Sequence, residues 1–161
     1  MKELRLIFPR CITLLGLVFV GWYPRRDVWG RLRLPPSFEL LPEAKRILAE
    51  FGGLKFGQRT NFTWFDPSAG EEVVGEIRQF EVLCGHRLYP LGFREHQDRE
   101  YLLVDESGVI YLLSDGLQPF ASSFNRALQL LFWKVQRRVQ IDRDLQSTGM
   151  AGKNWYIDGP S

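Results

Sequence analysis

The hydrophobic pattern predicts three helices in the body of the chain. Apolar residues recur every three or four positions, as one face of a helix requires, within residues 41–51, 71–84 and from 122 onward. The predicted inward-facing residues are Ala44, Ile47, Leu48, Phe51, Val73, Ile77, Phe80, Cys84, Phe124, Ala127, Leu128, Leu131, Phe132 and Val135. Pro42 suits a first helical turn, and Ser122-Ser123 supply an N-cap for the last helix, which we expect to continue to about Asp144.

Strand signals fill the segments between these helices. The stretches rich in β-branched, aromatic and other apolar residues are 61–66, 88–91, 100–104, 109–113 and 118–121. Between two of them, Asp105-Glu-Ser-Gly108 predicts a tight turn in which the glycine takes a left-handed conformation and the two acidic residues are solvated. Residues 67–70 are expected to form a loop. The strands should pair into an antiparallel sheet.

The two ends of the chain lack this alternation. Residues 11–20 are apolar and follow Lys2, Arg5 and Arg10, as in a signal peptide, but no small-x-small cleavage site follows. The run is also too short to span a bilayer, so we expect a buried first helix from about Arg10 to Val20. The tail after Gln146 has no periodicity, so it is expected to be largely mobile, with residues 155–157 docking locally.

Composition narrows the class of protein. At 161 residues, 45% hydrophobic and 14% aromatic, the chain can form one domain with an ordinary core. Lys and Arg number 21 against 19 Asp and Glu, which is too nearly balanced for a broad nucleic-acid or membrane footprint. Cys11 and Cys84 are far apart without regular spacing, which favours reduced intracellular thiols and leaves a single bridge open.

Candidate catalytic chemistry is sparse. Cys84 and His86, with Asp98 or Asp105, could be combined as nucleophile, base and orienting acid. Cys84 nevertheless lies on the apolar stripe of its predicted helix, where a thiol is usually a small core residue. Cys84, His86 and His96 show neither CxxC nor HxxxH spacing, so no metal site is predicted. We therefore predict no enzyme, no catalytic residue and no cofactor.

Six short motifs carry a family resemblance. In order along the chain they are Gly21-Trp-Tyr-Pro-Arg-Arg26, Leu48-Ala-Glu-Phe-Gly-Gly-Leu54, Phe65-Asp-Pro67, Arg87-Leu-Tyr-Pro-Leu-Gly92, Val104-Asp-Glu-Ser-Gly108 and Phe124-Asn-Arg-Ala-Leu128. Together they resemble the SUKH superfamily, specifically its bacterial immunity-protein branch. The resemblance implies an α+β fold, a single domain whose central, mostly antiparallel sheet is flanked by helices. It divides the chain into an apolar N-terminal helix (1–20), a SUKH-like domain (21–135) and a helix end with a mobile tail (136–161).

The same resemblance implies a non-enzymatic task. An immunity protein of this branch binds and neutralises a cognate polymorphic toxin, often a nuclease or nucleic-acid deaminase, in the cytoplasm of the producing bacterium. The wider superfamily also implies an alternative, a general protein-interaction scaffold. A third alternative is nucleic-acid binding, because Trp22-Tyr23 with Arg25-Arg26, or Arg59 with Phe62 and Trp64, could stack bases and contact phosphates. Neither direct nucleic-acid contact nor a membrane is expected for the immunity protein.

The toxin expected for this protein defines candidate contact residues. A toxin that acts on nucleic acid usually has a basic cleft, which carboxylates of an inhibitor can cover, with exposed aromatic residues as anchors. The predicted partner-binding residues are Trp22, Arg26, Trp64, Glu72, Glu76, Glu95, Asp98 and Glu100. Glu81, Asp105, Glu106 and Trp155 are further candidates. The hydrophobic pattern favours core burial for Trp22 and Trp64, and solvated turn positions for Asp105 and Glu106.

Overall fold

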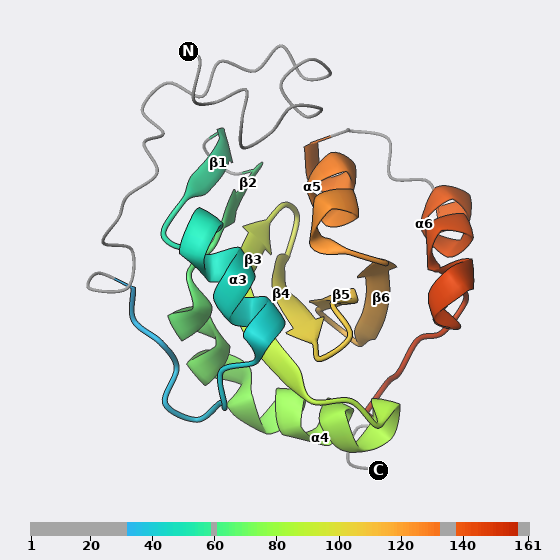
Figure 1. Ribbon diagram of the computed structural model, residues 1–161, viewed down its shortest axis with the longest axis horizontal. Helices are drawn as coiled ribbons and strands as arrows, with labels where there is room; N and C mark the ends of the chain where they lie inside the picture. Colours follow the sequence, from blue (N-terminus) through green and yellow to red (C-terminus); the bar gives the residue numbers. More distant parts are fainter. Residues whose placement is uncertain (1–31, 59–60, 133–137, 158–161) are drawn as a thin grey trace.

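The computed structural model describes residues 32–58, 61–132 and 138–157 (Figure 1). The helix predicted over residues 10–20 and the candidates Trp22 and Arg26 lie outside them. The described elements are α3 (Pro42–Phe51), β1 (Lys55–Gln58), β2 (Asn61–Trp64), η1 (Pro67–Val73), α4 (Val74–Cys84), β3 (Leu88–Glu95), β4 (Arg99–Asp105), β5 (Ile110–Leu113), β6 (Leu117–Ala121), α5 (Phe124–Phe132), α6 (Arg138–Leu145) and η2 (Gln146–Thr148).

The six strands form one sheet in sequence order, β1 to β6, and every neighbouring pair is antiparallel. This confirms the predicted α+β architecture with an antiparallel sheet. β1 was not predicted, because Lys55-Phe-Gly-Gln58 contains one apolar side chain and an interior glycine, a poor strand signal. Its pairing with β2 is a tertiary effect that periodicity does not reveal.

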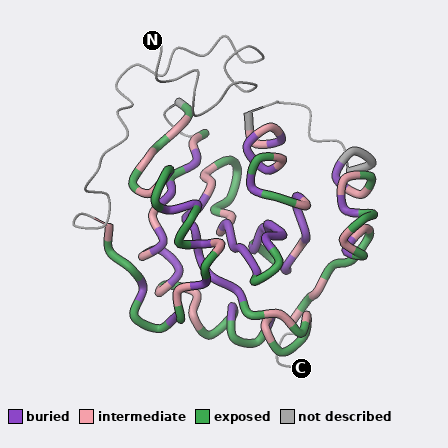
Figure 2. Tube along the Cα trace, viewed as in Figure 1, coloured by how far each residue is buried: buried purple, intermediate pink, exposed green. Residues whose placement is uncertain are grey.

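The core lies between the sheet and α3 and α5. The four apolar positions predicted for α3, Ala44, Ile47, Leu48 and Phe51, are all buried, and Pro42 is in the first turn as expected. The Phe51 ring contacts Phe124 of α5 with centroids 4.8 Å apart and Phe65 with centroids 5.9 Å apart. Figure 2 shows the buried segments concentrated on the central strands and on the sides of the helices that face them.

Residues 67–70, predicted as a loop, are helical. They belong to the 3-10 helix η1, where Asp66 caps the N-terminus by accepting a hydrogen bond from the Ser68 amide at 3.1 Å. Pro67 fits the first turn of this helix. α4 consequently begins at Val74, later than the periodicity indicated, and the predicted core positions Ile77 and Phe80 are buried.

The prediction of one C-terminal helix reaching Asp144 is wrong. The Ser122 amide donates a 2.8 Å hydrogen bond to the Asp144 carboxylate, whereas one continuous helix would separate these residues by about 30 Å. α5 and α6 are instead two helices that both pack near β6 (Figure 1). The predicted N-cap at Ser123 is confirmed, because its side chain accepts from the Arg126 amide at 3.4 Å.

The segment after α6 returns to the sheet. Leu117 of β6 and Trp155 exchange two backbone hydrogen bonds, of 2.9 and 3.0 Å. The Trp155 ring lies 6.3 Å from the Tyr111 ring of β5, between centroids. The predicted local docking of Trp155 is therefore confirmed, and this half-buried residue covers part of the sheet.

Candidate partner-binding surface

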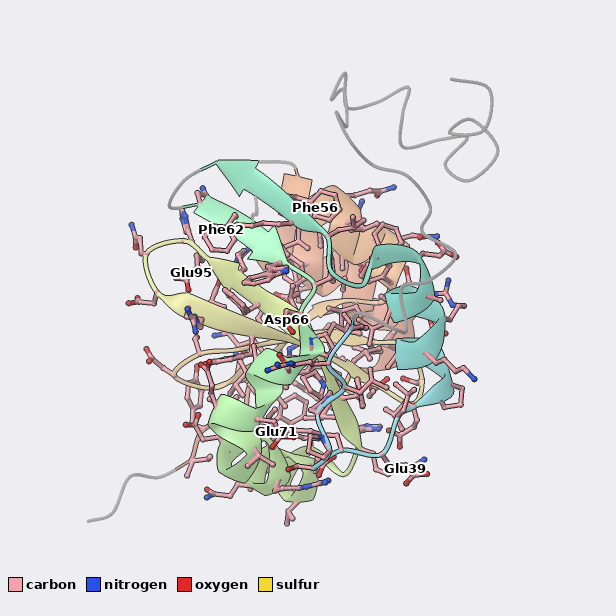
Figure 3. The ribbon with its side chains drawn as sticks, turned by 90° about the vertical axis from the view of Figure 1, so that its left-hand side faces the viewer. Glu39, Phe56, Phe62, Asp66, Glu71 and Glu95 are labelled. Carbon is pink, nitrogen blue, oxygen red and sulfur yellow. The ribbon has the colours of Figure 1, made fainter. Side chains whose placement is uncertain are left out.

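One face of the sheet carries a cluster that we call the outer sheet surface. Its members are Lys55 of β1, Phe62 and Trp64 of β2, Phe93 and Glu95 of β3, Arg99 and Tyr101 of β4, and Glu72 of η1. Directly paired residues of antiparallel strands face the same side, and the register aligns Lys55 with Trp64, Phe93 and Tyr101, and Phe62 with Glu95 and Arg99. The strands that carry this surface are in view in Figure 3, with Phe62 and Glu95 labelled.

This face points away from α3 and α5. Side chains alternate between the two faces of a strand, and Phe65, which follows Trp64, packs against Phe51 of α3 and Phe124 of α5. Trp64 therefore projects to the opposite side and is 37% exposed. The predicted core burial of Trp64 is wrong, because composition shows an aromatic residue but not the face of the sheet that it occupies.

Contacts with neighbouring aromatic rings and with Lys55 hold Trp64 in place. The buried Phe93 ring of β3 contacts two rings of β2, with its centroid 5.8 Å from that of its paired residue Trp64 and 6.0 Å from that of the diagonal residue Phe62. The Lys55 ammonium lies over Phe62, 3.6 Å from its centroid, and 5.8 Å from that of Trp64. These contacts hold the aromatic side chains in place while leaving part of Trp64 in solvent.

Arg99 links the aromatic residues to the acidic ones. Its guanidinium lies over the Phe93 ring, 4.4 Å from the centroid. Its Nε is 2.6 Å from a Glu95 carboxylate oxygen, and Nη1 is 3.1 Å from Glu72, which also accepts a 2.9 Å hydrogen bond from the Tyr101 hydroxyl. The hydrogen bond with Glu95 raises the pKa of Arg99, so this residue is cationic throughout the physiological range. Burial, followed by the hydrogen bond to Glu72, raises the pKa of Tyr101, which keeps its hydroxyl protonated as a donor.

The remaining predicted site residues lie elsewhere or point elsewhere. Glu76 is exposed on the first turn of α4, and Asp98 is exposed in the β3–β4 turn; neither forms a salt bridge with a described residue. Glu100 lies on the face of the sheet opposite Arg99 and Tyr101, where its carboxylate pairs with Arg94. Of the eight predicted residues, the structure thus brings together Trp64, Glu72 and Glu95.

Three further acidic candidates accept hydrogen bonds within the fold. Asp105 is fully buried, so its predicted solvation is wrong, although its expected turn chemistry is present. Glu81 is half-buried and accepts a 2.8 Å hydrogen bond from the Leu88 amide, which joins the end of α4 to β3. Glu106 is exposed, as predicted for a turn residue, and accepts from the Arg87 amide at 3.0 Å.

Sequence reasoning missed the residues that connect this cluster, namely Phe93, Arg99 and Tyr101. Their signal is the cross-strand register of β3 with β4, which places Arg99 opposite Glu95 and Tyr101 opposite Phe93. Had the hairpin been aligned from its turn at residues 96–98, the alternation of the two strands would have put all three on one face.

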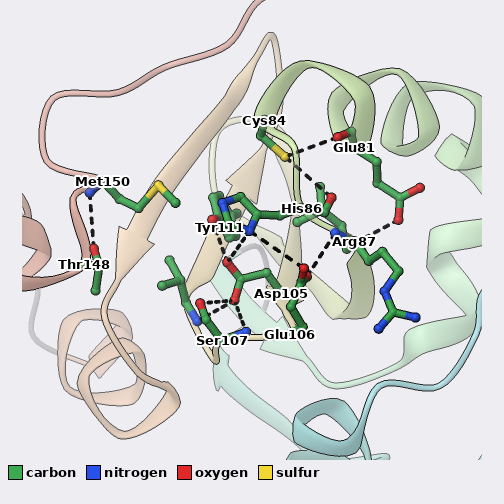
Figure 4. Close-up of polar contacts among 12 residues, drawn as sticks. Glu81, Cys84, His86, Arg87, Asp105, Glu106, Ser107, Tyr111, Thr148 and Met150 are labelled. Atoms are coloured by element: carbon green, nitrogen blue, oxygen red, sulfur yellow. Dashed lines mark hydrogen bonds and ion pairs between the residues drawn. The ribbon is translucent and has the colours of Figure 1, made fainter.

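The geometry around Cys84 and His86 does not match a nucleophile and base (Figure 4). The Cys84 thiol donates to backbone carbonyl oxygens, of His86 at 3.7 Å and of Glu81 at 3.9 Å, and burial raises its pKa, which disfavours the reactive thiolate. The His86 Nδ1 atom instead lies 4.0 Å from an Asp105 oxygen and 3.9 Å from a Glu106 oxygen. The imidazole and the thiol therefore have separate partners.

Neither a candidate metal centre nor a membrane span lies within residues 32–58, 61–132 and 138–157. No group of three His, Cys, Asp or Glu side chains is placed to hold a metal ion. No helix in these ranges is long and apolar enough to cross a membrane.

The fold and surface define a class of protein. A six-stranded antiparallel meander with helices packed against it is an α+β domain consistent with the SUKH fold. The profile of the SUKH-3 immunity protein family matches residues 16–132, and the chain belongs to this family. No protein with a curated description and no solved structure matches the chain. Membership in an immunity-protein family indicates a non-catalytic role directed at a toxin partner.

Proposed function

We propose that the protein binds and neutralises a cognate polymorphic toxin, a nuclease or nucleic-acid deaminase, by covering its active site. The observation that carries this proposal is the family match, which spans every described element from α3 to α5. The exposed Trp64 beside carboxylates adds support, because interfaces are centred on aromatic and arginine side chains.

The mechanism is steric and electrostatic. A cleft that holds nucleic acid is lined with basic side chains, so an inhibitor that presents carboxylates speeds encounter and excludes the anionic substrate. Glu72 and Glu95 supply such carboxylates near Trp64, and Glu76 and Asp98 supply two that are exposed and have no described salt-bridge partner. Trp22 and Arg26, which lie outside the described residues, and Glu100 remain proposed contacts.

Affinity capture tests the proposal. The full chain, tagged and produced in its native host, is purified at physiological salt, and the retained proteins are identified by mass spectrometry. A single stoichiometric companion that arrests growth when produced alone, and does not when the chain is present, is the expected result. Several weakly held, non-toxic companions would instead indicate the scaffold of the wider superfamily.

Nucleic-acid binding is a second candidate that one observation favours. Phe62 and Trp64 lie close to Lys55, an arrangement on which bases can stack beside phosphate contacts. Against it, Arg99 is held by Glu72 and Glu95, whose carboxylates repel a phosphate backbone. Nucleic acid retained in the capture experiment in place of a protein companion would establish this candidate.

A further inference from the structure

We infer that the outer sheet surface is the centre of the toxin interface and that its Glu72–Arg99–Glu95 cluster receives a lysine or arginine side chain of the toxin. This inference rests on the proposed function, which it deepens by naming the surface and the chemistry of the group bound. The occupant is the basic, substrate-binding face of a toxin domain that acts on nucleic acid.

The first argument concerns the aromatic residues. Trp, Tyr and Arg dominate the energetic centres of interfaces, and the outer sheet surface presents Trp64, Tyr101 and Arg99 together. Trp64 stands on the buried Phe93 ring, so little side-chain freedom remains to be lost on binding. Three of the other exposed apolar side chains of the described residues, Leu34, Val82 and Leu83, are of types under-represented at such centres. The fourth, Tyr156, is of an enriched type and is therefore tested as a control below.

The second argument concerns charge. Among the described residues, Arg99 is shared by the carboxylates of Glu72 and Glu95, and Lys55 over Phe62 is the second cation of the surface, so these four charges balance. The exposed Asp98, in the turn between Glu95 and Arg99, forms no salt bridge with a described residue and adds one negative charge. A lysine or arginine of the partner restores balance at this point. The arriving cation need not displace Arg99 from both carboxylates, because two bases then face two acids.

The geometry indicates which carboxylate accepts the partner. Arg99 is held more closely by Glu95, at 2.6 Å, than by Glu72, at 3.1 Å, and the Glu72 side chain is 58% exposed. Exposed ion pairs contribute little to stability, so the contact between Arg99 and Glu72 exchanges readily for one with a partner side chain. Arg99 remains on Glu95 and over Phe93, and the Tyr101 hydroxyl continues to orient Glu72.

The test uses the companion retained by the wild-type chain as the probe, purified and titrated against variants of the full chain. Glu72→Lys and Trp64→Ala are each expected to weaken its binding tenfold or more. Glu39→Lys is the matched control, because Glu39 is 82% exposed and also holds an arginine, Arg87, at 3.1 Å. Tyr156→Ala controls for loss of an exposed aromatic ring, since Tyr156 is 59% exposed. Both controls are expected to leave the affinity within about twofold of the wild-type value.

A cross-linking arm gives a positive result that does not depend on lost affinity. A photoreactive phenylalanine analogue replaces Trp64 in one protein and Tyr156 in another, and the cross-linked companion peptide is sequenced. Attachment at position 64 alone, to a peptide that contains lysine or arginine, is the expected outcome. If Glu72→Lys and Trp64→Ala both bind with the wild-type affinity and no attachment occurs at position 64, the outer sheet surface is not the interface, while the proposed function stands. Capture of no toxic companion by the wild type would instead overturn the proposed function itself.

Discussion

The Tyr111 hydroxyl donates a 2.8 Å hydrogen bond to the Asp105 carboxylate, and both side chains are fully buried. The same carboxylate accepts from the Ser107 amide at 2.8 Å, the Ser107 hydroxyl at 2.7 Å and the Val109 amide at 3.0 Å. Four donors thus compensate for the burial of this carboxyl group, because a buried polar group costs free energy unless it is hydrogen-bonded. Asp105 is the residue that fixes the β4–β5 turn against the strand that follows it.

Asp105→Ala is expected to destabilise the protein by about 2–4 kcal/mol, because buried donors of the turn lose their acceptor. Urea unfolding followed by circular dichroism measures the loss. The matched variant is Glu106→Ala, which removes an exposed neighbouring carboxylate and is expected to cost less than about 1 kcal/mol. Similar losses in the two variants would show that the buried network does not stabilise the turn.

Gly108→Val is expected to cost about 1–3 kcal/mol, because Gly108 has φ +89°, a conformation that a β-branched residue resists. The added Cβ has room, with Glu43 atoms no closer than 3.6 Å, so the effect isolates backbone strain. Gly75→Ala in α4 is the control: Gly75 has no positive φ and no atom near the added Cβ, and alanine favours a helix. An unaltered melting temperature in Gly108→Val would refute the turn.

Tyr89→Phe is expected to leave the stability at neutral pH unchanged or slightly higher. The Tyr89 hydroxyl is buried without a hydrogen-bond partner among the described residues, so its removal abolishes an uncompensated polar group. Thermal denaturation measures the effect at pH 7. Tyr111→Phe provides the contrast, because it removes the donor to Asp105 and is expected to lower the melting temperature.

Tyr89→Phe should also change how the stability of the protein responds to alkaline pH. Burial raises the pKa of Tyr89 to about 12, whereas a tyrosine in the unfolded chain ionises near pH 10. Above pH 10 the unfolded state therefore binds fewer protons than the folded state, and Tyr89 lowers the stability by about 1.4 kcal/mol per pH unit up to about pH 12. In urea unfolding between pH 9 and 11.5, the free energy of unfolding should fall less steeply for Tyr89→Phe than for the wild type. Parallel declines in the two proteins would disprove this contribution of Tyr89.

Asp144→Ala is expected to loosen α6 from the start of α5. The carboxylate of Asp144 accepts hydrogen bonds from the Ser122 amide at 2.8 Å and hydroxyl at 2.9 Å, and lies 3.5 Å from Arg126. The free energy of unfolding should fall by about 1–3 kcal/mol. Amide hydrogen exchange should become faster in residues 141–157. Asp115→Ala, in the exposed β5–β6 turn, is the control and should leave exchange there unaltered. Equal exchange in both variants would contradict the anchoring role.

Helical faces were predictable because their signal is local. The spacing of Ala44, Ile47, Leu48 and Phe51 determines one face of α3 wherever that helix packs, and all four are buried. Contacts between distant segments were not predictable in the same way. Helical spacing continues past Phe132, so the division into α5 and α6 becomes evident only from the contact of Ser122 with Asp144.

The candidate surface was predicted in part for the same reason. Trp64, Glu72 and Glu95 were identified by residue type, but their common neighbours Phe93 and Arg99 depend on the register of β2, β3 and β4. Asp105 was assigned to solvent because acidic turn residues usually are solvated. Its burial follows from four donors that converge on it, and one of them, Tyr111, belongs to the next strand.

Titration of the captured companion's activity on nucleic acid with the purified full chain tests the proposed inhibition most directly. A protein that covers the toxin's active site should abolish turnover at one equivalent, with a short oligonucleotide substrate as fully as with a long one. A stable one-to-one complex that continues to turn over the short substrate at the uninhibited rate would contradict occlusion of the active site.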